Sequence, residues 1–540
     1  MSSEPEHTSA HPPPPVQSRR NLLRAMGTIS LFTLLSRMMG FVRDMVMAHH
    51  FGAGMGADAF FVAFKLPNFL RRLFAEGAFN TAFIPVFSEY VARGDREAAR
   101  EAAQAIFSAL TVILLVVVLL GQLFMPFVVY IAAPGFADQP DKFQLTIELT
   151  RITFPYILFI SLVAMASGIL NCYHKFALPA VTPLLLNVCL IFGALVLAPH
   201  LEQPTMGLAI GVLLGGIVQL ALLWPALKQL GIPLKMRWQL VARRDRHPAI
   251  GRLLTLMGPS VLGVSVAQIN LLVDLFIASW LPAGSISYLY YADRLVEFPL
   301  GLIGIAMGTA ILPSFSARVA HNDLDGLRQD LDFALRLMLF INIPATAGLL
   351  AMGEPILSLL FERGAFNHEI TQLTAQALFA YGAGLSAFSA IKIAAPVFYS
   401  LKDTRTPVKI AIVCMLANIL FSLLLMGPLQ HAGLALATTL SAFLNAGLLF
   451  YHLRDKVGYH PGPAVWKLLF KTFLATAVMT LFLFWGHATY WQPTASTAHK
   501  AMILLPLLLA AALLFAVTTW LLGMDEPRVL ISNLRKRKER

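Results

Sequence analysis

Long apolar runs separated by short polar connections dominate the chain from residue 24 onward. Two of them, "ALTVILLVVVLLGQLFMPFVVYIAA" (109–133) and "AMILLPLLLAAALLFAVTTWLLG" (501–523), contain almost no polar residue. A helix needs about 20 residues to cross a bilayer, so the pattern predicts an all-α polytopic membrane protein with about 14 transmembrane helices. The predicted helices are centred in segments 24–50, 57–90, 105–133, 146–172, 178–199, 205–228, 250–280, 284–316, 327–351, 370–400, 406–427, 431–452, 465–487 and 500–523.

The composition agrees with this pattern and excludes a water-soluble globular protein. Of the 540 residues, 57% are hydrophobic and only 13% are charged, whereas a soluble protein carries about 25% charged residues. Three cysteines, Cys172, Cys189 and Cys414, lie far apart in or beside apolar runs and predict neither a metal site nor a disulfide. We find no P-loop and no nucleophile–base motif, so we expect no cofactor and no enzyme chemistry.

The net charge of +12 is placed as membrane topology requires. Alternate connections are rich in Lys and Arg, as in Arg93, Arg96 and Arg100, while the intervening ones, such as "FGAGMG" and "LPAGS", are almost free of them. Because cytoplasmic loops carry the positive charge, this alternation predicts an even number of spans with both termini in the cytoplasm. It also explains the basic end "RKRKER" without nucleic acid.

An internal repeat divides the chain. "TAFIPVFSEYVARGD" (81–95) matches "TAILPSFSARVAHND" (309–323) at a shift of 309 − 81 = 228 residues, and Asp44 corresponds to Asp274 at a shift of 230. Two six-helix halves in parallel orientation are typical of transporters, whose substrate site lies between the repeats. The predicted division is a disordered tail, an N-terminal lobe, a C-terminal lobe, two additional helices and a basic tail, at 1–20, 21–235, 246–458, 464–524 and 525–540.

Charged residues interrupt equivalent apolar segments of both halves. Such residues normally face a bundle interior or a watery cavity and mark a substrate path. Arginine binds phosphate or carboxylate oxygens through two parallel donors and stays charged, so a cavity with several arginines suits an anion such as a diphosphate. The arginines of this set are Arg37, Arg43, Arg71 and Arg294, and the charged residues near them are Asp44, Asp58, Lys65, Arg72, Glu76, Asp293 and Glu297.

A structural role is the alternative for several of these charges. Arg72 and Glu76 are four residues apart and form a ready ion pair on a helix, while Asp44 and Asp58 could only orient arginines. Segment 57–90 is too long for one straight span, and Pro67 is expected to bend it. Of its cations we favour Arg71 for the substrate and leave Lys65 and Arg72 open.

Several motifs carry a resemblance to a known family. Residues 21–90, "APGFAD" (133–138), "ITFPYILFISL" (152–162), "YYADRLVEFPLG" (290–301) and "TPVKIAI" (406–412) closely resemble the MurJ (MviN) family of lipid II flippases. This family belongs to the multidrug/oligosaccharidyl-lipid/polysaccharide exporter superfamily. The proline-rich extension of about 20 residues at the N-terminus departs from the family pattern.

The resemblance implies a function and roles for the residues. Family members move undecaprenyl-diphosphate-linked disaccharide-pentapeptide across the bacterial inner membrane by alternating access, with membrane potential or a sodium or proton gradient as the driving force. Arg37, Arg43, Arg71 and Arg294 would engage the diphosphate. Asp44, Asp58, Arg72, Glu76, Ser287, Asp293 and Glu297 would shape or gate the cavity. The last two helices would form a groove for the polyprenyl tail, and Asp274 would be a candidate sodium ligand.

Other functions stay open at this point. One is a flippase for another polyprenyl-diphosphate-linked glycan or a cation-coupled drug exporter, although four arginines oppose a cationic substrate. Another is a non-transporting scaffold that binds the lipid-linked precursor and recruits cell-wall synthesis proteins. The expected partners are lipid II, membrane lipids and such synthesis proteins, and no nucleic acid.

Overall fold

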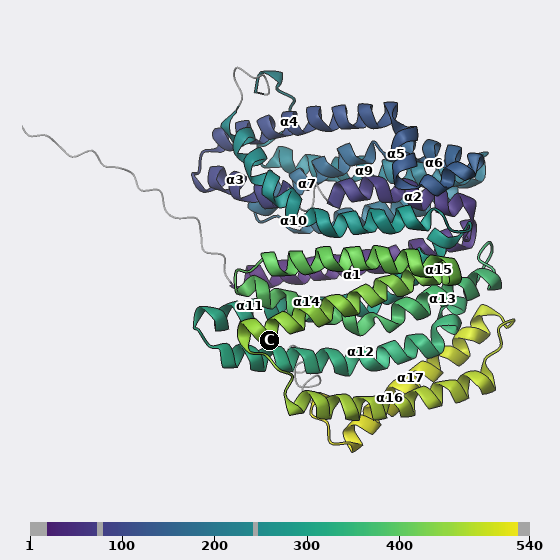
Figure 1. Ribbon diagram of the computed structural model, residues 1–540. Coiled ribbons are helices and arrows are strands. Elements are labelled where there is room, and N and C mark those ends of the chain that lie inside the picture. Colours follow the sequence, from purple (N-terminus) through teal and green to yellow (C-terminus); the bar gives the residue numbers. More distant parts are fainter. Residues whose placement is uncertain (1–18, 73–78, 241–246, 528–540) are drawn as a thin grey trace, which may run out of the picture.

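A computed structural model describes residues 19–72, 79–240 and 247–527, including their side chains apart from those of 19–26, 240, 259–267 and 302–310. The described chain is helical and contains no strand (Figure 1), which confirms the predicted all-α fold. Glu76, most of the N-terminal tail 1–20 and the basic end of the chain lie outside the described residues.

The helices follow the predicted segments closely. In the first half they are α1 (Arg19–Phe51), α2 (Met55–Leu70), α3 (Asn80–Ala92), α4 (Arg96–Leu123), α5 (Met125–Ala132), α6 (Pro140–Thr153), α7 (Tyr156–Cys172), α8 (Ala177–Phe192) and α9 (Thr205–Gln229). After these come α10 (Pro248–Ala278), α11 (Ser285–Ala320), α12 (Leu324–Phe361), α13 (His368–Ala383), α14 (Leu385–Ser400), α15 (Arg405–Val457), α16 (Pro463–Tyr490) and α17 (Thr497–Leu521).

Many of these helices are long and apolar enough to span a membrane. Within the described ranges, nine helices, some of them continuous across short breaks, are long and apolar enough to cross a membrane. The exact number of 14 spans stays a prediction. Segment 57–90 is divided between α2 and α3, and α2 ends at Leu70, three residues beyond Pro67.

Helix α15 contains two of the predicted segments and is broken between them. Gln430 has φ 49° and ψ −127°, a conformation that a residue with a side chain rarely adopts. Gly433 follows the break, and a Cβ there would lie 2.3 Å from the carbonyl oxygen of Leu425. The chain therefore turns sharply between 406–427 and 431–452, as the apolar pattern predicts.

The start of α15 is fixed by a carboxylate. Asp403 accepts hydrogen bonds from the amides of Arg405 and Thr406 and from the Thr406 hydroxyl, and it pairs with Lys456 near the other end of the helix. The Lys456 ammonium and the Thr406 hydroxyl hold the pKa of this carboxyl well below its ordinary value. Both ends of the folded-back helix are thereby joined.

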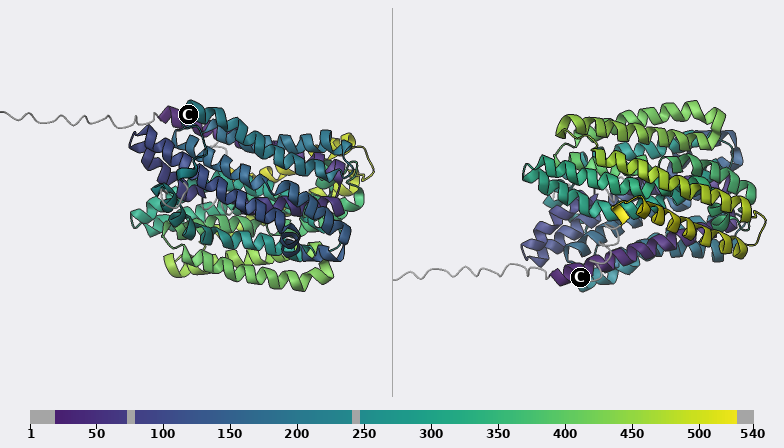
Figure 2. Two further views of the ribbon diagram at one scale, coloured as in Figure 1. Left: turned by 90° about the horizontal axis from the view of Figure 1, so that it is seen from above. Right: turned by 90° about the horizontal axis from the view of Figure 1, so that it is seen from below.

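The two halves of the chain make related packing contacts. Helix α1 packs on α8, and its counterpart α10 packs on α15 and on α3. In Figure 1, α2 to α10 lie in the upper part and α11 to α14 in the lower part, with α16 and α17 beneath them. Seen from below (Figure 2), α16 and α17 lie across the front of the bundle, where α16 packs against α12.

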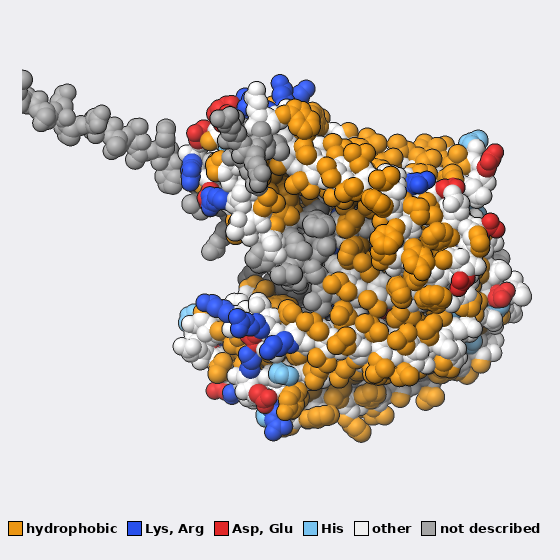
Figure 3. Space-filling model, turned by 45° about the horizontal axis from the view of Figure 1, so that its top comes forward, with side chains coloured by type: hydrophobic (Ala, Val, Ile, Leu, Met, Phe, Trp, Pro, Cys, Tyr) orange, Lys and Arg blue, Asp and Glu red, His pale blue; other side chains and the backbone are white. Residues whose placement is uncertain are grey.

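The outer surface is apolar, as a lipid-facing surface must be. On α17, Met502, Leu505, Leu509 and Leu513 are all more than half exposed at a helical spacing of three or four residues. Hydrophobic side chains cover most of the face in Figure 3. A soluble monomer rarely exposes a patch of this size, so this surface is fitted to the bilayer interior.

Glycines let two helices of the first half approach closely. Gly193 follows α8, Gly207 lies on α9, and a Cβ on Gly207 would lie 2.6 Å from the carbonyl oxygen of Gly193 and 2.7 Å from the amide of Ala198. Small residues at such crossings allow backbone-to-backbone packing inside a membrane.

Substitution of Gly207 by Ala is expected to destabilise the protein, because the new methyl group meets backbone atoms that cannot rotate away. The matched control is Gly447→Ala on α15, where a Cβ has no neighbour within 4 Å. We expect a melting temperature several degrees lower for Gly207→Ala in detergent and an unchanged or slightly higher one for Gly447→Ala. Equal melting temperatures for the two variants would contradict the packing argument.

A buried ion pair joins α2, α6 and α11. Asp58 and Lys142 are each 1% exposed, and their charged atoms are 3.0 Å apart. Asp58 also accepts hydrogen bonds from the amides of Gly284 and Ser287 and from the Ser287 hydroxyl, at 2.7, 3.0 and 2.7 Å. Asp58 thus caps the start of α11, and the alternative that it orients an arginine is wrong, since its partner is a lysine.

The change Asp58→Ala is expected to cost about 3–5 kcal/mol, because it leaves the Lys142 ammonium buried without a counter-charge. The double change Asp58→Leu with Lys142→Met should cost less, since no buried charge remains. Glu97→Ala, in the exposed pair with Arg100, serves as the control and should have almost no effect. Thermal melting of the purified variants measures all three, and a double variant less stable than Asp58→Ala would refute the explanation.

Candidate functional site

A hollow lies between the upper and lower groups of helices at the end where the first described helix begins. Figure 3 shows this hollow with lysine and arginine side chains gathered at its lower rim. The described site residues predicted from the sequence lie on helices α1, α2, α10 and α11 and directly after α2.

Arg43 and Asp44 form the most enclosed part of the site. Arg43 donates to Asp44 Oδ1 through Nε at 2.9 Å and Nη2 at 2.6 Å, and it donates to Asn187 of α8 at 2.8 Å. The Tyr290 hydroxyl of α11 accepts from Arg43 and donates to Asp44, each at 2.9 Å. Arg43 is only 7% exposed, so in this conformation its guanidinium holds other side chains in place and is not at the cavity surface.

Arg294 extends this network toward the open side. Its Nε lies 3.5 Å from Asp44 Oδ2, and its Nη1 pairs with Glu297 at 2.7 Å. The guanidinium carbon lies 4.8 Å from the centre of the Tyr290 ring, a cation–π contact. Arg294 is one-third exposed, which leaves part of its charge available to an anion.

Lys65 brings α2 together with α10 and α11. It is half-buried and interacts electrostatically with Asp274 of α10 and Asp293 of α11. Asp293 is exposed although it lies inside an apolar helix. An exposed charge at such a place is expected where water enters a cavity.

Asp274 of α10 contacts a polar neighbour on its own helix. Its carboxylate accepts a hydrogen bond from Asn270 at 3.2 Å and interacts electrostatically with Lys65. Among the described residues, no group of three or more His, Cys, Asp or Glu side chains could hold a metal ion. The role of Asp274 as a sodium ligand stays a prediction.

Arg71 and Arg72 follow directly after α2. Arg71 Nε donates to Asn68 at 3.0 Å, and this arginine makes at least one further contact. Arg72 is exposed and lies within electrostatic range of Lys65 and Asp293. The expected pair between Arg72 and Glu76 falls outside the described residues.

Arg37 lies on α1, before Arg43 in the chain. Its Nη1 would be only 2.0 Å from a Cβ built on Gly301, so the guanidinium rests on the bare backbone of α11. The structure therefore places Arg37 of α1 against α11, the helix that carries Arg294. Ser287 and Asp58 lie in the buried contact described above and do not face the hollow.

Sequence reasoning missed four polar residues of this region. Asn187 and Tyr290 complete the contacts of Arg43, and Lys142 is the partner of Asp58. Lys392, an isolated lysine in the apolar run "AFSAIKIAAP", interacts electrostatically with Glu297 and Arg37. Because a charge inside a predicted span is costly, the sequence alone could have identified Lys392 as a candidate site residue.

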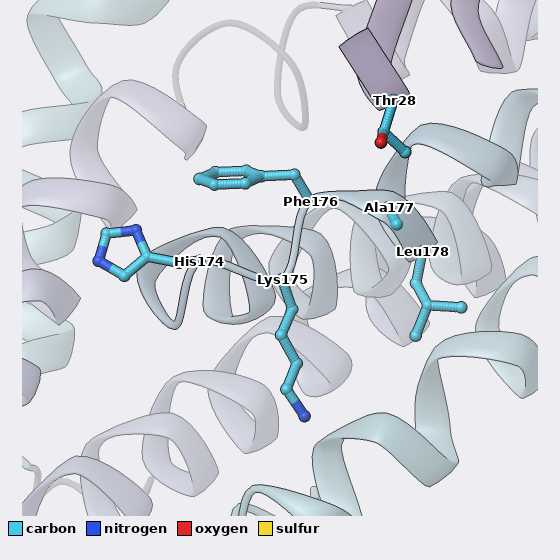
Figure 4. A pocket seen from close by; sticks show the side chains of 6 residues that line it. All are labelled: Thr28, His174, Lys175, Phe176, Ala177 and Leu178. Atoms are coloured by element: carbon cyan, nitrogen blue, oxygen red, sulfur yellow. The ribbon is translucent and has the colours of Figure 1, made fainter. Parts of the chain in front are cut away.

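A separate pocket of about 320 Å³ lies where α1 passes the start of α8. Thr28, His174, Lys175 and Phe176 are among its lining residues, and the polar ends of His174 and Lys175 point in different directions (Figure 4). These groups do not converge on one ligand, so the site of interest is the hollow between the helix groups.

Comparison with known proteins identifies the family. The profile described as "Lipid II flippase MurJ" matches residues 47–506. The chain is 44% identical over 474 residues to a protein of Vibrio cholerae named probable lipid II flippase MurJ, covering 86% of this chain and 89% of that protein. It is 40% identical over 510 residues to a lipid II flippase MurJ of Burkholderia cenocepacia, covering 93% and 98%.

Solved structures agree with this assignment. The chain resembles "Lipid II flippase MurJ, inward closed conformation" with a TM-score of 0.75 at 27% identity, covering 92% of this chain and 99% of that one. It also resembles an inward-facing multidrug resistance MATE family transporter with a TM-score of 0.65, covering 78% and 94%, and at 14% identity this likeness shows the fold alone. From the profile and the relatives together, the chain belongs to the family of the lipid II flippase MurJ.

Proposed function

We propose that this protein moves lipid II, the undecaprenyl-diphosphate-linked disaccharide-pentapeptide, from the cytoplasmic to the periplasmic leaflet of the bacterial inner membrane. Family membership supports the substrate. The observation that carries the proposal is the partly exposed Arg294, held by Asp44 and Glu297. A guanidinium that keeps a third of its surface exposed suits a diphosphate.

The proposed mechanism is alternating access of two six-helix lobes, residues 21–235 and 246–458. The head group enters the cavity from the cytoplasm while the polyprenyl tail stays in the bilayer along the last two helices, 464–524. As the cavity opens to the periplasm, contacts between the two lobes, such as that of Asp44 with Arg294, break and other contacts form. Both termini lie in the cytoplasm, and membrane potential or a sodium or proton gradient drives the cycle.

Transport fits the residues better than the other functions do. A drug exporter shares the fold, but a cationic drug would meet Arg37, Arg294 and Lys65. The exposed charges deep inside apolar helices, Asp293 and Glu297, are costly. A scaffold that only recruits cell-wall synthesis proteins has no need of them.

Depletion of the protein is expected to trap lipid II in the cytoplasmic leaflet. The measurement is the fraction of lipid II accessible to a membrane-impermeant reagent added from the periplasmic side. We expect this fraction to fall as the protein is lost and to recover on re-expression. Unchanged periplasmic accessibility after complete depletion would reject the flippase function and favour the scaffold.

Two arginine variants test the proposed site. Arg294→Ala removes a charge-assisted contact worth about 1.5–3 kcal/mol, so we expect at least about tenfold slower transport. Arg43→Lys should also slow transport, because one ammonium cannot replace the planar guanidinium that contacts Asp44, Asn187 and Tyr290. Arg363→Ala, at an exposed position after α12, is the control. Full complementation of the depleted strain by both site variants would refute the proposed site.

A further inference from the structure

The last two helices are attached to a single helix of the second half of the chain. Among the described helices, α16 and α17 make extensive contacts only with α12 and with each other. In Figure 1 both lie beneath α12, on the side away from α2 to α10. The three helices share a hydrophobic core of their own, with Phe340 from α12, Leu468 from α16 and Leu504 from α17 among its members. Neither of the two larger cores of the described chain contains a residue of α17.

One end of α17 is held by a buried lysine. Lys500 lies in the first turn of α17 and is only 5% exposed. Its Nζ donates to the Ser358 hydroxyl of α12 at 2.8 Å and to Glu362, the residue that follows α12, at 3.1 Å. His368 of α13 contacts the other carboxylate oxygen of Glu362 at 3.3 Å. Separation of α17 from α12 would leave the Lys500 ammonium without this carboxylate, so the contact resists it.

The opposite end of α17 is also held by polar contacts. Glu526, which follows α17, lies 3.4 Å from Arg336 of α12. Lys471 of α16 donates to the carbonyl oxygen of Leu522 at the end of α17, where a cation also complements the helix dipole. Because the 25 residues of α17 span about 37 Å, the contacts at its two ends lie near opposite faces of the membrane.

One side of α12 carries several of these contacts. Asp332, Arg336 and Phe340 follow one another at intervals of four residues and so lie on the same side of the helix. Asp332 accepts a hydrogen bond at 2.5 Å from Tyr459, which lies in the connection that leads to α16. Phe340 packs on Phe515 of α17, with the ring centres 5.4 Å apart. This side of α12 is therefore used for the attachment of the last two helices.

We propose that Lys500, Glu362 and Arg336 are positioning residues for transport, which hold α16 and α17 on α12 so that this helix pair moves with the second lobe as one body. The inference rests on the proposed function, in which the polyprenyl tail lies along these two helices. When the lobes rock, α16 and α17 keep their place relative to the second lobe and change it relative to the first. The tail is thereby carried with one lobe while the head group crosses between both.

The first test joins α12 and α17 covalently. Phe340→Cys and Phe515→Cys are introduced into the full-length chain after its native cysteines are replaced by alanine, and a short thiol-reactive reagent links them. In proteoliposomes we expect lipid II transport at the rate of the same variant without the link, because the two helices do not separate. The matched control links His49→Cys to Ala365→Cys, where the backbones of the two halves are 2.8 Å apart, and this link should stop transport.

The second test loosens one end of α17. Lys500→Gln removes the charge-assisted contact with Glu362, so we expect about tenfold slower transport of lipid II with its undecaprenyl tail. An analogue with a farnesyl tail should be transported at the wild-type rate, since its short tail contacts little of α16 and α17. Lys500→Arg keeps the charge and should restore most of the lipid II rate. The control is Lys467→Gln, an exposed lysine on α16, which should leave both rates unchanged.

The outcomes separate this inference from the proposed function. Arrest of transport by the link between α12 and α17 would overturn the inference. An unchanged lipid II rate in Lys500→Gln would do the same, and so would equal slowing of both lipids, which would reflect a general loss of stability. All three results leave the flippase function intact. A wild-type protein that transports neither lipid would reject the proposed function itself, and the inference with it.

Discussion

The ion pair of Arg43 and Asp44 is the contact on which the site depends. Asp44 is 1% exposed and receives hydrogen bonds from Arg43 and from Tyr290, while Arg294 approaches its second oxygen. Removing one partner of such a buried pair leaves a charge that the interior cannot solvate. The partners of Asp44 come from α1 and α11, and Asn187 of α8 holds Arg43 in turn. This requirement therefore fixes helices from both halves of the chain around one carboxylate.

Much of the fold could be predicted because the bilayer imposes a simple pattern. The described residues of each predicted segment are mostly helical, and even the division of α15 at Gln430 follows from the polar interruption around Pro428. The apolar run does not show how such segments pack. The contact of α1 with α8, or the close approach at Gly207, depends on side-chain shape far away in the sequence.

The site could be predicted only as far as charge reveals it. Arg37, Arg43, Arg294 and Asp44 were conspicuous since charges inside spans are costly. The structure brings Arg43, Asp44 and Arg294 together and places Arg37 against Gly301 of α11. Tyr290 and Asn187 carry no charge, and in an apolar helix nothing marks a tyrosine as the hydroxyl that joins an arginine to an aspartate. The sequence also could not distinguish the enclosed Arg43 from the accessible Arg294, since exposure is a property of packing.

The carboxylates of the cavity have a function in the absence of substrate. Without Asp44 and Glu297, the buried part of the Arg294 guanidinium would have no counter-charge. Without Asp274 and Asp293, the same would hold for the Lys65 ammonium. These carboxylates act as internal counter-ions when the cavity is empty. If the diphosphate binds at these cations, as proposed, it competes with the carboxylates, and the pairs that it disrupts offset part of its attraction. The cations still outnumber these carboxylates, so the proposed binding stays favourable. When the diphosphate leaves, the carboxylates pair with the arginines again. A transporter must both bind and release its substrate. Paired arginines allow both steps, whereas a pocket that contained only cations would oppose release.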